Sequence, residues 1–161
     1  MSQRIVAAGE HWHGDMRDLI VNPDEVGRML TLDALIINED RHRRNILVEP
    51  VDDEAHLRLW AIDSGNALIG QLDDFIGRDL TVPSPHNHAR GLPIDVLRPA
   101  ALAAAQVAAQ LPEEKLRAIV AEACALAREP SVDRLAAALT ARCRQAPSIV
   151  SGYLDALGVL S

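Results

Sequence analysis

Residues 38–48 read Asn-Glu-Asp-Arg-His-Arg-Arg-Asn-Ile-Leu-Val, and residues 60–65 read Trp-Ala-Ile-Asp-Ser-Gly. The first stretch is too polar for a core element, yet it runs directly into an apolar segment. Polar loops held between ordered elements are common positions for functional residues. These two stretches decide how the rest of the chain is interpreted.

A helix is predicted over residues 23–37, immediately before the first stretch. Asn22 is a good N-cap, Pro23 suits the first helical position, and Glu25 completes a capping box. Apolar side chains then recur at helical spacing. The polar loop is therefore expected to follow directly on the end of a helix.

A β-hairpin is predicted after the loop, with strands at 46–51 and 57–62 joined by a short polar turn. The outer ends of two antiparallel strands lie side by side. We therefore expect the 40–45 loop to meet the 63–65 loop in space. Trp60 lies on the second strand, where packing in the core is expected.

The remaining chain predicts an irregular segment at 69–98 and a helical subdomain at 99–161. Proline and glycine interrupt the first, and the second reads as four short helices. These helices are predicted to open at Pro99, Pro112, Ser131 and Pro147. The predicted fold class is α+β, mostly α, as a single domain over 1–161 with helix, loop and hairpin in 1–68.

Length and composition restrict the class of protein. With 161 residues, 48% of them hydrophobic, the chain suits one globular domain. The formal net charge of −7 argues against a nucleic-acid partner, which normally meets a basic face. No signal peptide or membrane-spanning run is visible, so a cytoplasmic location is expected. Cys124 and Cys143 have no metal spacing and are expected to be reduced and buried.

The hairpin is expected to bring four polar residues together: Asp40, His42, Asn45 and Asp63. Two carboxylates and an amide oxygen are ligands that suit Mg²⁺. Phosphoryl transfer uses such a set, with one Asp orienting the attacking hydroxyl and accepting its proton. An Asn and a second Asp then hold the metal ions that bridge the nucleotide phosphates.

The pattern Asn38-x-Asp40-Arg41-His42-x-x-Asn45, followed by Ile62-Asp63-Ser64-Gly65, resembles the catalytic and metal-binding loops of the HipA-like kinases. It is also similar to the phosphatidylinositol 3- and 4-kinases, which share the Asp-Arg-His-x-x-Asn order. The resemblance covers residues 26–68. It implies the C-lobe of a protein-kinase-like fold that uses ATP and Mg²⁺ to phosphorylate a hydroxyl of a protein or small molecule.

The resemblance also implies roles for individual residues. Asp40 is the expected catalytic aspartate. His42 supports it or touches the transferring phosphate, and Arg41 braces the loop or pairs with a carboxylate. Asn45 and Asp63 are the expected Mg²⁺ ligands. Two further residues shape the cofactor-binding loops, Asn38 by hydrogen bonding within its loop and Gly65 by allowing the turn after Asp63. Ser64 departs from relatives, in which this residue is often large.

An N-lobe is missing from these 161 residues. Only 39 residues precede Asp40, and they include no lysine and no Gly-rich loop. An N-lobe of about five strands and a helix needs roughly 60 residues or more. Three alternatives are open. A separate polypeptide supplies the N-lobe, the chain is a fragment that binds metal and nucleotide weakly, or it is a non-catalytic, pseudokinase-like binding or regulatory protein.

Other features have competing interpretations. Arg41, Arg43 and Arg44 form a basic cluster that either attracts phosphates or lies in a solvated loop beside nearby carboxylates. A metal-dependent hydrolase built on Asp40, His42 and Asp63 would need one more ligand. The histidine pairs lack the further ligands of a known zinc spacing, so surface histidines are expected at His11, His13, His86 and His88.

Overall fold

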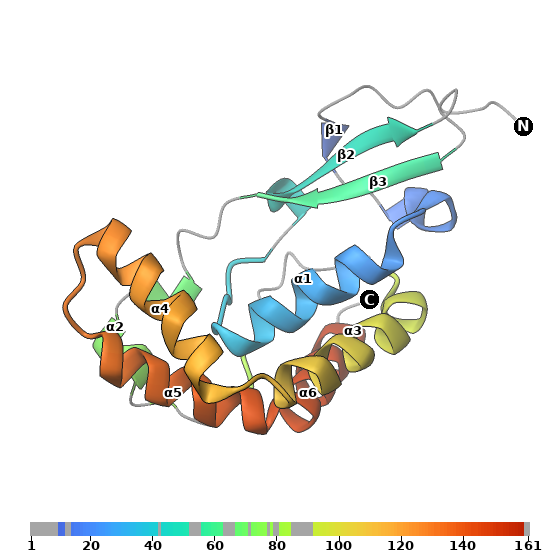
Figure 1. The fold of residues 1–161 in the computed structure, drawn as a ribbon. Coiled ribbons are helices and arrows are strands. Elements are labelled where there is room, and N and C mark those ends of the chain that lie inside the picture. Colours follow the sequence, from blue (N-terminus) through green and yellow to red (C-terminus); the bar gives the residue numbers. More distant parts are fainter. Residues whose placement is uncertain are drawn as a thin grey trace, which may run out of the picture.

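The computed structural model describes residues 10–11, 14–41, 43–51, 56–62, 67–70, 72–76, 78, 81–84 and 92–159. The chain is α+β and mostly helical, with one small antiparallel sheet, as predicted. Figure 1 shows the sheet above α1, with the other long helices below and beside it. The elements in chain order are β1 (Glu10–His11), the 3-10 helix η1 (Gly14–Leu19), α1 (Pro23–Leu35), η2 (Arg43–Asn45), β2 (Ile46–Val51), β3 (His56–Ala61), η3 (Ala67–Gly70), α2 (Leu72–Ile76), α3 (Ile94–Ala109), α4 (Glu113–Ala127), α5 (Val132–Arg144) and α6 (Ala146–Val159).

The sheet has the order β1-β2-β3, and each neighbouring pair is antiparallel. The hairpin of β2 and β3 is confirmed, and its second strand begins one residue earlier than predicted. Alternate side chains of both strands face the core, as the two-residue period of a strand requires. These buried residues are Ile46, Val48, Leu57 and Leu59.

Helix α1 lies at the centre of the fold, where it contacts β3, α3, α5 and α6. It begins where predicted, but the Asn22 side chain does not cap it. Instead Asn22 Nδ2 donates to the Leu59 carbonyl at 2.9 Å, and the Leu59 N–H donates to Asn22 Oδ1 at 2.9 Å. The asparagine therefore ties the start of the helix to β3. The helix ends two residues earlier than predicted, and Ile37 takes a left-handed conformation with φ 51°.

Helix α3 begins at Ile94, so Pro99 lies inside it and does not open it. An internal proline removes one helical hydrogen bond and costs about 3 kcal/mol. Ile94 and Leu97 are buried before it, and burying such a side chain contributes about 1.5–3 kcal/mol, which offsets that cost. The segment 69–98, expected to be irregular, therefore contains α2 and the start of α3.

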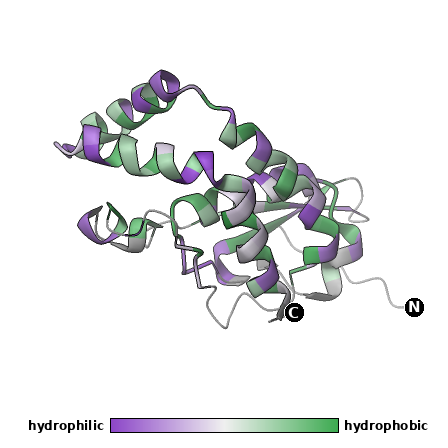
Figure 2. Cartoon of the chain, turned by 90° about the horizontal axis from the view of Figure 1, so that it is seen from below, coloured by the Kyte–Doolittle hydropathy of each residue, from purple (hydrophilic) through white to green (hydrophobic). Residues whose placement is uncertain are grey.

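Helices α4, α5 and α6 begin within one residue of the predicted positions. One apolar cluster joins the sheet with α1, α3 and α6, and a second joins α2, α4 and α5. Figure 2 shows hydrophilic and hydrophobic segments alternating along the helices, as in amphipathic helices. Cys124 and Cys143 are free and buried, as expected.

Trp60 was predicted to be a core residue, and this prediction is wrong. Its side chain is 49% exposed, and its indole N–H donates to Glu49 at 2.9 Å. The reason is the strand period, because Leu57 and Leu59 occupy the buried face and Trp60 falls on the other. Within the described part of the chain, no helix has the length and apolar character to cross a membrane.

Candidate functional site

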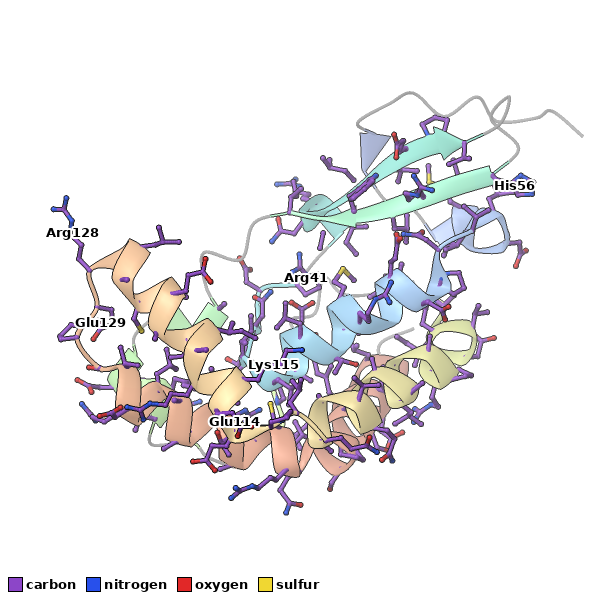
Figure 3. The ribbon with its side chains drawn as sticks, in the orientation of Figure 1. Arg41, His56, Glu114, Lys115, Arg128 and Glu129 are labelled. Carbon is purple, nitrogen blue, oxygen red and sulfur yellow. The ribbon has the colours of Figure 1, made fainter. Side chains whose placement is uncertain are left out.

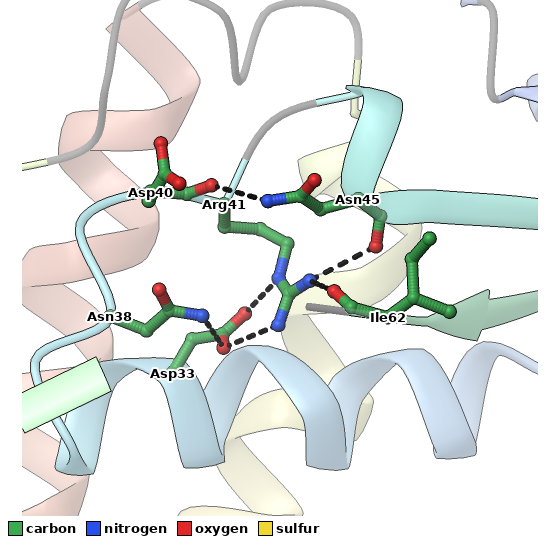
Figure 4. Close-up of polar contacts among 6 residues, drawn as sticks. All are labelled: Asp33, Asn38, Asp40, Arg41, Asn45 and Ile62. Atoms are coloured by element: carbon green, nitrogen blue, oxygen red, sulfur yellow. Dashed lines mark hydrogen bonds and ion pairs between the residues drawn. The ribbon is translucent and has the colours of Figure 1, made fainter. Parts of the chain in front are cut away.

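The loop after α1 is held against the end of β3 by the side chain of Arg41. Its Nη1 donates to the main-chain oxygen of Asn45 at 3.0 Å and to that of Ile62 at 2.8 Å. The Ile62 N–H donates to the same Asn45 oxygen at 2.9 Å (Figure 4). The open end of the hairpin is therefore closed at Asn45 and Ile62. The 63–65 loop, which was expected to meet the 40–45 loop here, lies outside the described residues, so that approach stays a prediction.

Asp33, in the last turn of α1, fixes the orientation of Arg41. Arg41 Nε donates to Asp33 Oδ2 at 2.7 Å, and Nη2 donates to Oδ1 at 2.9 Å. Each of the two side chains is 2% exposed. Paired hydrogen bonds of this kind are short and directional, because a planar guanidinium meets a planar carboxylate. The plane of the guanidinium is therefore set by the helix.

This burial corrects one interpretation of Arg41. The residue does not belong to an exposed basic cluster with Arg43 and Arg44, because its guanidinium faces the interior between α1 and the sheet (Figure 3). It both braces the loop and pairs with a carboxylate, the two roles that were left open. Because the guanidinium is buried and bonded to protein atoms, it does not reach out to a phosphate.

Asn38 links the start of the loop to the same carboxylate. Its Nδ2 donates to Asp33 Oδ1 at 2.7 Å, and its main-chain N–H donates to the Asp33 carbonyl at 2.8 Å. Asn38 was expected to hydrogen-bond within its loop, whereas these two hydrogen bonds are made to α1. Among the described residues its Oδ1 has no hydrogen-bond partner, although the side chain is buried.

Asp40 and Asn45 lie at the two ends of the loop and are joined by one hydrogen bond. Asn45 Nδ2 donates to the Asp40 main-chain oxygen at 3.0 Å. Figure 4 shows the Asp40 carboxylate on the side of the loop away from Asp33. Asp40 is partly exposed, whereas Asn45 is buried. The buried arginine and the partly exposed carboxylate therefore lie on opposite sides of one short loop.

The chemistry of these groups fits a hard divalent cation. Because the side-chain nitrogen of Asn45 donates to the main chain of Asp40, its side-chain oxygen remains the group that can act as a ligand. Oxygen ligands from amides and carboxylates are those that Mg²⁺ prefers. Asp63, the second expected ligand, lies outside the described residues. Within the described part of the chain, no three His, Cys, Asp or Glu side chains gather as a metal site.

Tyr153 on α6 is a buried neighbour of this network. Burial raises the pKa of its hydroxyl well above the ordinary value, the Asp33 and Glu39 carboxylates raise it further, and the Arg41 guanidinium lowers it. The hydroxyl is fully buried and has no hydrogen-bond partner among the described residues. The charges of Asp33 and Arg41 therefore act on Tyr153, although no hydrogen bond among the described residues joins its hydroxyl to them.

Several predicted residues lie outside the described part of the chain. These are His42, Asp63, Ser64 and Gly65, together with His13, His86 and His88; the side chain of His11 is also not described. Their expected roles stay predictions.

Asp33 was not identified from the sequence, although a signal was present. It lies on the apolar stripe of α1 with Val26, Leu30 and Ala34, all of which are buried. A carboxylate at a core position must be paired or hydrogen-bonded, so its place on that stripe was a reason to look for a buried cation.

Comparisons of the chain with protein-family models, with curated proteins and with solved structures found no match in any of the three. The assignment of a function therefore depends on the residues of this loop and their geometry.

Proposed function

We propose that the chain is the C-terminal catalytic lobe of an ATP- and Mg²⁺-dependent phosphotransferase of the HipA-like kinase type. One observation carries the proposal. A single buried guanidinium bonds the chain at or next to the three positions that such a reaction needs. Arg41 directly follows Asp40, bonds the main chain of Asn45, and bonds the main chain of Ile62, which precedes Asp63.

Each residue then has a separate task. Asp40 orients the acceptor hydroxyl and accepts its proton, because its carboxylate lies on the partly exposed side of the loop. Asn45 and Asp63 would hold Mg²⁺ through oxygen atoms. The bound cation would neutralise charge on the transferring phosphoryl group. Asn38 and Arg41 hold the loop in place, and His42 lies two residues after the catalytic aspartate in the sequence.

The acceptor is a hydroxyl of a protein or small molecule, and an N-lobe that is not within these 161 residues completes the nucleotide cleft. Positioning and charge stabilisation account for most of the catalysis in phosphoryl transfer. A lobe that lacks half of its cleft is therefore expected to bind nucleotide weakly by itself and to gain activity with its partner.

The first test is thermal unfolding with and without Mg²⁺-ATP, for the native sequence, Asp63→Asn and Asp74→Asn. Asp74 is an exposed carboxylate on α2 and serves as the matched control. A ligand at 100 times its dissociation constant stabilises by about 2.7 kcal/mol, or roughly 5–10 °C for a chain of this size. Because the lobe alone binds weakly, we expect a smaller shift than this in the native sequence and in Asp74→Asn, the full shift once the partner is added, and neither in Asp63→Asn.

Transfer of labelled phosphate, measured with the chain and any co-purified partner, completes the test. Asp40→Asn is expected to abolish transfer while the thermal shift is kept. If neither the shift nor transfer occurs with the partner present, the proposal is wrong, and a non-catalytic, pseudokinase-like binding or regulatory protein becomes the better interpretation.

A further inference from the structure

The Asp33–Arg41 pair lies behind the proposed catalytic residues and cannot touch a substrate. Both side chains are 2% exposed, and Asp33 belongs to α1, over which the loop lies (Figure 4). The Asp40 carboxylate points away from this pair in Figure 4. Any effect of Asp33 on the reaction therefore has to pass through its partners, Arg41 and Asn38, and the main chain.

Arg41 contacts two segments that are far apart in the sequence. Its Nη1 bonds the carbonyl of Asn45, just before β2, and the carbonyl of Ile62, just after β3. The Asn45 carbonyl also accepts the Ile62 N–H. These three hydrogen bonds close the open end of the hairpin around one guanidinium group.

Asp33 determines where that guanidinium lies. Its two oxygens accept from Nε and Nη2 at 2.7 and 2.9 Å, and Oδ1 also accepts from Asn38 Nδ2 at 2.7 Å. Both ends of the loop are therefore connected to the Asp33 carboxylate. Asn38 makes this connection at the start of the loop, and Arg41 makes it at the open end of the hairpin. A single buried group thus fixes the loop relative to the helix.

We propose that Asp33 is the positioning residue of this site and that it sets, through Arg41, the placement of Asp40 relative to Asn45 and Ile62. The inference deepens the phosphotransferase function proposed above, and its catalytic readout rests on that function. A misplacement of about 1 Å costs on the order of 100-fold in rate when a reaction depends on positioning.

The test removes the pair without leaving a buried charge. Asp33→Asn leaves Arg41 uncompensated and can unfold the protein, whereas Asp33→Leu combined with Arg41→Met replaces both groups by apolar side chains. Such double replacements often keep or raise stability. Asp155→Asn breaks the exposed ion pair with Arg98 and is the matched control.

Two measurements are made on the same proteins. The first is kcat for phosphoryl transfer from Mg²⁺-ATP, and the second is amide hydrogen exchange of Ile62 without nucleotide. In the double variant we expect a cooperative thermal unfolding transition, a fall in kcat of about 100-fold, and exchange of the Ile62 amide about tenfold faster. The control is expected to match the native sequence in both measurements.

The outcomes separate the two proposals. If the double variant folds and keeps its kcat, or if its Ile62 exchange is unchanged, Asp33 has only a structural role and the positioning inference is overturned. If the native sequence neither binds Mg²⁺-ATP nor transfers phosphate, the proposed function fails. Exchange at Ile62 then still decides whether Asp33 orders the loop.

Discussion

Arg142 is a fully buried cation on α5 that caps the end of α1, and replacing it by methionine should destabilise the fold. Its Nε donates to the Leu35 carbonyl at 2.6 Å and its Nη2 to the Ala34 carbonyl at 2.7 Å. Its Nη1 donates to the Arg78 carbonyl at 3.1 Å, and the guanidinium lies 5.9 Å from the centre of the Phe75 ring. The last turn of a helix has carbonyls without helical partners, and here the arginine supplies donors to two of them.

The magnitude follows from these contacts. Each buried carbonyl left without a donor costs about 1–3 kcal/mol, and a cation at a helix C-terminus contributes up to about 2 kcal/mol. Removing a buried charge offsets part of this loss of stability, since the guanidinium no longer has to be desolvated. We expect Arg142→Met to lower the free energy of unfolding by about 3 kcal/mol, and the melting temperature by roughly 6–12 °C.

Urea unfolding followed by circular dichroism measures this change against Arg144→Met. Arg144 is also on α5, but its side chain is 67% exposed in an ion pair with Glu113. An exposed ion pair contributes little, so the control should lose at most about 1 kcal/mol. A loss in Arg142→Met no larger than in the control would refute the reasoning, because the α1 carbonyls would then be satisfied without this arginine.

Two further predictions concern Gly27 on α1, with Gly158 as its control, and Tyr153 on α6. In Gly27→Ala the new Cβ would lie 2.6 Å from the Ala101 main-chain nitrogen on α3, so we expect a loss of about 1–3 kcal/mol in urea unfolding. Gly158→Ala meets nothing within 4 Å and should be neutral or slightly stabilising. Tyr153 is the one tyrosine of the sequence, and burial first, then the nearby carboxylates, raise the pKa of its hydroxyl. Below pH 10 both the folded and the unfolded chain keep this proton. Above pH 10 only the unfolded chain releases it, so stability should fall by about 1.4 kcal/mol per pH unit until the folded hydroxyl titrates. Absorbance at the tyrosinate band should show no titration near pH 10 in the native chain and full titration in urea; titration near pH 10 in the native chain would contradict the assigned burial.

The hairpin and most helices could be predicted because their signals are local. Alternation at 46–51 and the start signals at Pro23 and Pro112 depend only on neighbouring residues, and the structure has these elements within a residue or two. The approach of Asn45 to Ile62 also followed, because antiparallel strands bring their outer ends together.

The parts that sequence analysis missed depend on distant segments. Arg142 reaches carbonyls more than 100 residues earlier in the chain, and no local pattern marks such a contact. Trp60 is exposed because α1 covers only one face of β3. Pro99 is tolerated inside α3 because buried side chains lie on the turn before it. In each case tertiary packing decides the outcome over the local preference.

Two buried arginines therefore enclose the turn that connects α1 to the proposed catalytic loop. Arg142 binds the last carbonyls of the helix, and Arg41 binds the first described residue after β3. Apolar side chains in place of the Asp33–Arg41 pair could give equal or greater stability, because burying two charges carries a large desolvation cost. They could not, however, donate to main-chain oxygens in fixed directions. The physical advantage of the arginines is that they set the position of the loop between its two anchors, and the double variant at Asp33 and Arg41 separates this effect from stability.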